Sequence, residues 1–186
     1  KGKAAEAAGD TVTNTGIGWH GARVPTIVTS GPRAAFVEVT QRMKSELSIP
    51  LITTNRINDP KVAEDILAAG QADMVSMARP LLADAAFVNK AADGRADEIN
   101  ICIACNQACL DHTFQLKRAS CLVNPRACHE TELNFEPTTA PKHFAVVGAG
   151  PAGLAFAVEA AKPGHPATRV ANADQAARHV NLPPFY

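Results

Sequence analysis

Short apolar runs alternate with helical patterns through the first eighty residues. Each helical pattern is followed by a run that begins with apolar or β-branched residues and ends in polar ones. The three pairs are 4–8 with 11–16, 35–46 with 50–56, and 60–69 with 72–79. Strands that alternate with helices in this way are typical of parallel βα units. The pattern therefore predicts an α/β fold.

Capping residues define the third helix. Asp59 fits the N-cap and Pro60 the first helical position, and Gly70 fits the C-terminal cap. Polar residues at the carboxyl ends of parallel strands are a habit of TIM (β/α)8 barrels, whose active sites lie on that rim. Only three such strands are present, whereas a complete barrel has eight. We therefore predict that residues 1–100 form a part of a TIM barrel.

A second strand–helix unit begins at residue 143. The apolar run 144–147 leads into Gly148, Ala149, Gly150, Pro151, Ala152 and Gly153, and a helical pattern covers 154–161. A GxGxxG sequence between a strand and a helix is typical of dinucleotide binding, and this form favours FAD. The alternative is a glycine-rich turn without a ligand. No acidic residue ends the expected second strand near position 171, and the last twenty residues fit no regular element.

All five cysteines lie between positions 102 and 128. Four follow the spacing C-x2-C-x3-C-x11-C, at Cys102, Cys105, Cys109 and Cys121. Thiolates suit iron–sulfur clusters and zinc, and one loop that supplies three of four ligands favours a [4Fe–4S] cluster. Structural zinc, which prefers two CxxC pairs, and unrelated thiols are the alternatives. Cys128 is left over, and we interpret it as a small buried apolar residue.

Three cationic or titratable side chains follow strand ends on the predicted rim. His20 is either a catalytic group or a structural histidine. Arg56 and Arg79 follow successive strands, where the phosphate of a flavin would lie. Arg33 is either a contact for an acidic group of the substrate or an ordinary loop arginine.

Composition excludes several classes of protein. Eighteen basic and eighteen acidic residues give zero net charge, which argues against a nucleic-acid binder that depends on bulk electrostatics. The sequence contains no run of eighteen apolar residues, so it predicts no membrane-spanning helix. The clustered cysteines indicate a reducing, cytoplasmic setting rather than a secreted disulfide framework. Residue 1 is not Met, so we expect the chain to begin inside a longer protein.

Seven stretches resemble the bacterial NADPH-dependent 2,4-dienoyl-CoA reductases, which are flavin reductases of the old-yellow-enzyme type. The stretches are NTGIGWH (14–20), ARVPT (22–26), TTNRINDP (53–60), DMVSMARPLLAD (73–84), GRADEINICIACNQACLD (94–111), SCLVNPRACHE (120–130) and VVGAGPAGLAFA (146–157). Enoate reductases of the same family are the nearest alternative. The resemblance implies the C-terminal part of an FMN-binding TIM barrel over 1–100, an iron–sulfur segment over 101–130, a linker over 131–142, and the start of an FAD domain over 143–186.

The resemblance also implies an activity. NADPH would reduce FAD, electrons would pass singly through the [4Fe–4S] cluster, and FMN would reduce the dienoyl-CoA. His20 matches the residue that assists protonation, and Gly21, Ala22, Arg23 and Val24 match the substrate-binding stretch. Arg56, Ala78 and Arg79 match FMN contacts, residues 148–153 match the FAD loop, and the four spaced cysteines match the cluster ligands.

The chain departs from that family pattern in two ways. The family's catalytic tyrosine lies in earlier barrel strands, and the match fails after about residue 165. We therefore expect this chain to be an inactive segment by itself, with an acyl-CoA as the substrate of the whole polypeptide. Two other hypotheses remain open, which are a non-enzymatic module that zinc holds together and a truncated remnant that binds nothing.

Overall fold

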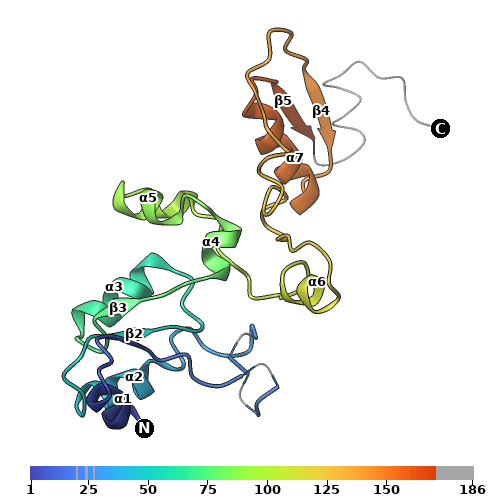
Figure 1. Cartoon of the computed structure of the whole chain (residues 1–186). Helices are drawn as coiled ribbons and strands as arrows, with labels where there is room; N and C mark the ends of the chain where they lie inside the picture. The colour runs from blue at the N-terminus through green and yellow to red at the C-terminus, as the bar shows by residue number, and fades with distance from the viewer. Residues whose placement is uncertain (20, 24, 27, 171–186) are drawn as a thin grey trace. The chain divides into compact units, whose positions relative to one another are not determined.

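The computed structural model describes residues 1–19, 21–23, 25–26 and 28–170 (Figure 1). The chain divides into two compact units, with the boundary between Glu130 and Thr131. Within the described residues, no helix is long and apolar enough to cross a membrane.

The first unit is built on a small parallel sheet. Its strands are β1 (Thr13–Asn14), β2 (Leu51–Thr53) and β3 (Met74–Val75), in the order β1-β2-β3. Asn14 pairs with Ile52, and Thr53 pairs with Val75. The parallel βα units predicted from the sequence are confirmed. The strands are shorter than the predicted runs because the polar ends leave the hydrogen-bonded ladder and form the loops of the rim.

Helices follow or precede each strand of this unit. They are α1 (Gly2–Ala7), α2 (Val37–Lys44), α3 (Pro60–Ala68), α4 (Arg79–Ala83), α5 (Phe87–Ala92) and the 3-10 turn η1 (Ala96–Glu98). The predicted caps of α3 are confirmed. A carboxylate oxygen of Asp59 accepts the Lys61 N–H at 2.9 Å, and Gly70 has a left-handed φ of +65° directly after the C-cap residue.

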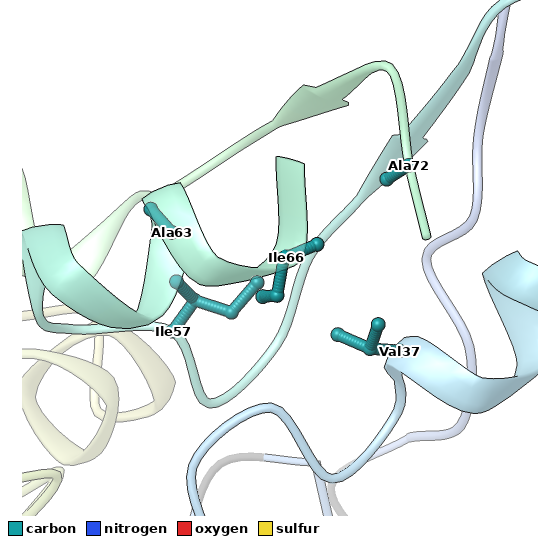
Figure 2. Close-up of a cluster of buried hydrophobic side chains, with 5 residues drawn as sticks. All are labelled: Val37, Ile57, Ala63, Ile66 and Ala72. Carbon is teal, nitrogen blue, oxygen red and sulfur yellow. The ribbon is translucent and has the colours of Figure 1, made fainter. Parts of the chain in front are cut away.

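An apolar cluster joins α2, α3 and the sheet. Its buried members are Val37, Ile57, Ala63, Ile66 and Ala72. Figure 2 shows Ile66 and Ala63 on α3 close to Ile57, with Val37 at the start of α2 turned toward them. Burial of these side chains fixes both helices against the sheet, and so fixes the loops that follow β2 and β3.

A chain of buried hydroxyl groups also ties α2 to the sheet. The hydroxyl of Thr40 in α2 donates to the Thr53 hydroxyl at 3.1 Å and lies 2.6 Å from that of Thr15. The Thr15 hydroxyl also donates to the Ile52 carbonyl oxygen at 3.0 Å. Because these groups are buried, each depends on the others for its hydrogen bonds.

The second unit contains one parallel βαβ motif. Strand β4 (Phe144–Val147), helix α7 (Pro151–Ala161) and strand β5 (Ala167–Val170) follow in that order, and β4 pairs with β5. The rings of Phe144 and of Phe156 on α7 pack in a T-shaped arrangement, with 5.4 Å between ring centroids. The prediction that residues after 166 form no regular element was wrong for β5. The strand forms because its backbone completes a ladder with β4.

Candidate functional site

A pocket of about 240 Å³ opens where β2 and β3 end. We call it the strand-end pocket. It is lined by Thr54, Asn55, Arg56, Ile57, Ser76, Met77, Ala78, Arg79, Pro80 and Leu110. The structure thus brings together Arg56, Ala78 and Arg79, the three residues for which the family resemblance implied contacts with FMN. Two guanidinium groups in one pocket favour an anionic ligand group.

Arg56 is held firmly in this pocket. Its residue is only 9% exposed, and its Nε donates to the Gly31 carbonyl oxygen at 2.8 Å. Burial, followed by the positive charge of Arg79, lowers the pKa of Arg56. The pocket therefore holds the buried positive charge of Arg56 close to that of Arg79. A bound phosphate would offset these charges.

The backbone at the end of β2 adopts a conformation that non-glycine residues rarely take. Asn55 has φ +73° and Arg56 has φ +55°, so two consecutive residues are left-handed. The Asn55 side-chain amide donates to the Ile17 carbonyl oxygen at 3.0 Å, and the Ala34 N–H donates to the Arg56 carbonyl oxygen at 2.9 Å. Such strain persists where surrounding contacts hold it, and it is common at functional sites.

Four cysteine side chains contribute to the lining of a second pocket. Cys102, Cys105, Cys109 and Cys121 all line it, together with Arg79, Leu82, Ile103, Asn106, Ala108, Leu122 and Val123. We call it the cysteine pocket. Burial raises the pKa of the Cys121 thiol, and the nearby Cys102 and Cys109 sulfurs also raise it. Hence the four thiols that the spacing selected share one environment.

Cys128 does not line the cysteine pocket. It is exposed, and its backbone is left-handed with φ +63°. The interpretation of Cys128 as a buried apolar residue was therefore wrong. The turn at residues 124–130 directs this residue outward, which the sequence spacing does not reveal.

The donor set of the cysteine pocket fits an iron–sulfur cluster. In the described part of the chain, no three Cys, His, Asp or Glu side chains are grouped closely enough to hold one metal ion. A cluster places irons and sulfides between its thiolates, so its ligands stand farther apart than those of a single ion. Four soft thiol ligands line one apolar pocket, and thiols are the donor type that such a cluster takes.

The loop that carries three of these thiols is bent by two left-handed residues. We call residues 102–110 the cysteine loop. Ala104 has φ +54° and Asn106 has φ +64°, and these turns bring Cys102, Cys105 and Cys109 to the same pocket. Helix α6 (Leu110–Phe114) then continues the chain.

Distant hydroxyl and amide groups hold the cysteine loop in place. The Thr29 hydroxyl donates to the carbonyl oxygens of Ile103 and Ala104, at 3.0 and 3.1 Å. The Asn58 amide donates to the Cys102 carbonyl oxygen at 2.7 Å. Thr29 and Asn58 both belong to loops of the barrel rim, so the rim and the cysteine loop form one connected site.

A buried carboxylate anchors the start of the cysteine segment, residues 101–130. Asp84 accepts the Ala86 N–H at 2.9 Å, the Lys90 ammonium at 2.7 Å and the Asn100 N–H at 3.0 Å. Burial opposes ionisation of Asp84, but these hydrogen bonds outweigh it and lower the pKa of Asp84. The ionised carboxylate therefore fixes the backbone two residues before Cys102.

The predicted substrate-binding stretch is described only in part. Gly21, Ala22 and Arg23 lie in a turn, and Arg23 is exposed, whereas His20 and Val24 lie outside the described residues. Arg33 donates to a carboxylate oxygen of Asp59 at 2.9 Å. This ion pair gives Arg33 a partner at the N-terminus of α3, and its role toward a substrate stays a prediction.

The glycine loop of the second unit connects β4 to α7. Gly148 has φ +115°, and a Cβ atom at Gly153 would lie 2.2 Å from the Gly148 carbonyl oxygen. Gly153 thus permits the close approach of α7 to the loop. A Cβ atom at Gly148 or Gly150 would meet no atom within 4 Å, and Ala149, Pro151 and Ala152 are exposed. The outer side of the loop is therefore open, and FAD binding there stays a prediction.

Four residues of this site were not found from the sequence. Thr29, Asn58, Asp84 and Asn106 act through contacts that span 16 to 75 residues. No short motif links such distant positions, so the sequence carried no signal for them.

Comparison with known proteins relates the chain to a group of reductases and oxidases. A metal reductase from Desulforamulus reducens is 46% identical over 180 residues, which is 97% of this chain and 27% of the relative. An NADH oxidase from Thermoanaerobacter brockii is 42% identical over 133 residues, which is 69% of this chain and 20% of the relative. The chain thus matches between about a fifth and about a quarter of the length of these relatives.

A solved structure supports the same assignment. The complex of 2-naphthoyl-CoA reductase with 2-naphthoyl-CoA matches with a TM-score of 0.83 and 33% identity, over 88% of this chain and 26% of that one. This likeness and the parallel βα units confirm the predicted α/β fold as part of a TIM-barrel flavoenzyme. The family model described as NADH:flavin oxidoreductase / NADH oxidase matches residues 1–98. The chain therefore belongs to the NADH:flavin oxidoreductase / NADH oxidase family.

Proposed function

We propose that this chain is the part of a flavin-dependent reductase in which an iron–sulfur cluster lies beside the FMN site. The observation that carries the proposal is the adjacency of two pockets. Arg79 lines both the strand-end pocket, with its two guanidinium groups, and the cysteine pocket, with its four thiols. FMN would occupy the first pocket and a [4Fe–4S] cluster the second.

The residues of the strand-end pocket suit the phosphate of FMN. Arg56 and Arg79 would offset the charge of the phosphate. The backbone N–H groups of Ala78 and Arg79, at the start of α4, would donate hydrogen bonds to the phosphate oxygens. Membership of a flavin oxidoreductase family supports this ligand. The FAD loop of residues 148–153 and a site for NADPH complete the proposal for the whole polypeptide, which we place in the cytoplasm because free thiolates require a reducing setting.

We further propose that the whole polypeptide reduces 2,4-dienoyl-CoA thioesters with NADPH. The likeness to a reductase whose structure contains a CoA thioester supports this substrate class. When bound, the flavins would supply the conversion between two-electron hydride transfer and single-electron transfer, and the cluster would supply the single-electron carrier. His20 would share the proton transfer that the enolate of the thioester requires, because a histidine titrates near neutral pH. Residues 21–24 and Arg33 would contact the acyl-CoA.

The first experiment tests the cluster. The chain is purified without oxygen, and iron, acid-labile sulfide, zinc and flavin are measured on one sample. We expect about four irons and four sulfides per chain. Cys121→Ser should lose the iron, and the matched control Cys128→Ser should keep it because Cys128 does not line the pocket. Zinc without sulfide would instead favour the non-enzymatic module.

The second experiment tests the substrate and the expectation of an inactive segment. Binding of a 2,4-dienoyl-CoA to the chain is compared with binding of the free dienoic acid and of cinnamate. Tighter binding of the thioester is expected, whereas a preference for the free acids would favour an enoate reductase. Turnover of the dienoyl-CoA with NADPH by the isolated chain would contradict the proposal that it is a segment of the enzyme.

A further inference from the structure

One hydrogen bond joins the two pockets. The Arg79 guanidinium donates through Nη1 to the side-chain oxygen of Asn106 at 2.6 Å. Arg79 begins α4 and lines the strand-end pocket, while Asn106 lies in the cysteine loop and lines the cysteine pocket. The two residues are 27 positions apart, so the fold alone makes this contact.

The backbone of the cysteine loop presents Asn106 for this role. Its φ of +64° is left-handed, a conformation that asparagine tolerates better than other non-glycine residues. Leu110, at the end of the same loop, also lines the strand-end pocket. Hence the cysteine loop reaches the strand-end pocket in two ways. Leu110 lines that pocket, and Asn106 accepts a hydrogen bond from Arg79, which also lines it.

The bond has a physical consequence for anion binding. An arginine side chain has many rotamers, and ordering it when a ligand arrives costs conformational entropy. Arg79 also lies close enough to Arg56 for their charges to interact, so in the absence of a ligand the two cations favour separation. A neutral acceptor such as Asn106 orders the guanidinium without neutralising its positive charge.

We infer that Asn106 is a positioning residue of the flavin site, which holds Arg79 for the FMN phosphate and so couples the cysteine loop to flavin binding. This inference rests on the proposed function, because it assumes that FMN occupies the strand-end pocket. It adds that folding of the cysteine loop around its cluster strengthens FMN binding.

The test uses the 186-residue chain and two flavins. FMN and riboflavin, which lacks the phosphate, are titrated into the chain and followed by flavin fluorescence. Asn106→Gly removes the acceptor and suits the left-handed backbone. We expect it to raise the Kd for FMN about tenfold, which corresponds to about 1.4 kcal/mol, and to leave the Kd for riboflavin unchanged. In an Arg79→Gln background, Asn106→Gly should have no further effect.

A matched control removes side-chain hydrogen bonds of another asparagine of the cysteine segment, including its bond to α4. The Asn124 amide donates to the Leu82 carbonyl oxygen in α4 at 3.0 Å, and Asn124 does not line the strand-end pocket. Asn124→Ala should therefore leave FMN binding unchanged. An equal loss of FMN and riboflavin affinity in Asn106→Gly would show a merely structural role and overturn the inference. An unchanged Kd for FMN, or no FMN binding by the wild-type chain, would also overturn it.

Metal analysis separates this inference from the proposed cluster. The titration is repeated on the metal-free chain and on the chain reconstituted with iron and sulfide, and tighter FMN binding is expected after reconstitution. If zinc or no metal is found, the proposed cluster fails, while the Asn106→Gly titration of the metal-free chain still decides the role of Asn106. If the cluster forms and FMN affinity does not change between the two states, the coupling alone is refuted.

Discussion

The carboxylate of Asp84 should contribute more to stability than any exposed charge of the chain. Its side chain is 7% exposed and that of Lys90 is 20% exposed. Asp84→Asn replaces the acceptor of three hydrogen bonds with an amide, whose NH2 group then faces an N–H or ammonium donor. Breaking a buried ion pair costs about 3 to 5 kcal/mol. Lys90 keeps its bond to the Glu98 carbonyl oxygen, so we expect a loss of about 3 kcal/mol.

The measurement is the free energy of unfolding in urea, followed by circular dichroism, with amide exchange of Asn100 as a local readout. Asp93→Asn is the matched control, because Asp93 makes an exposed ion pair with Arg95. That control should lose at most about 1 kcal/mol. If Asp84→Asn lost no more than the control, or left the exchange of the Asn100 amide unchanged, the reasoning would be refuted.

The same carboxylate predicts a pH dependence with a definite sign. The pKa of Asp84 is lowered from its ordinary value of 3.8 in the folded chain. Its ionised form therefore stabilises the fold above pH 3.8, and this contribution is lost as the pH falls below 3.8 through the folded pKa. The stability difference between wild type and Asp84→Asn should be constant near neutral pH and shrink in acid. A difference that grew in acid would contradict this assignment.

Three further predictions concern other parts of the chain. Thr40→Val should lower the free energy of unfolding by about 2 kcal/mol, measured in urea, because two buried hydroxyls lose a partner. Gly153→Ala should disrupt the second unit, whereas Gly150→Ala should keep its fold and shift only the NMR resonances close to position 150, since only the first added methyl collides with backbone. Alkylation of the iron-loaded chain should modify Cys128 first and leave Cys121 protected, as mass spectrometry of peptides would show.

Local sequence signals determined the elements of this protein. Asp59 and Gly70 mark the two ends of α3, because helix caps act within one helical turn. The glycine pattern at 148–153 is equally local, and it set the turn between β4 and α7. The resemblance to flavin reductases of the old-yellow-enzyme type is confirmed at the level of the family. Its finer implications, including the dienoyl-CoA substrate, stay proposals.

Only the tertiary structure decided which side chains meet. The spacing of the cysteines selected four of five thiols, but the outward turn at Cys128 depends on backbone conformation that no motif specifies. The bond between Arg79 and Asn106 joins a helix and a loop whose positions depend on the packing of the whole first unit. Contacts within a few residues follow from local propensity, whereas contacts across tens of residues exist only after burial of the apolar cluster has fixed the elements in space.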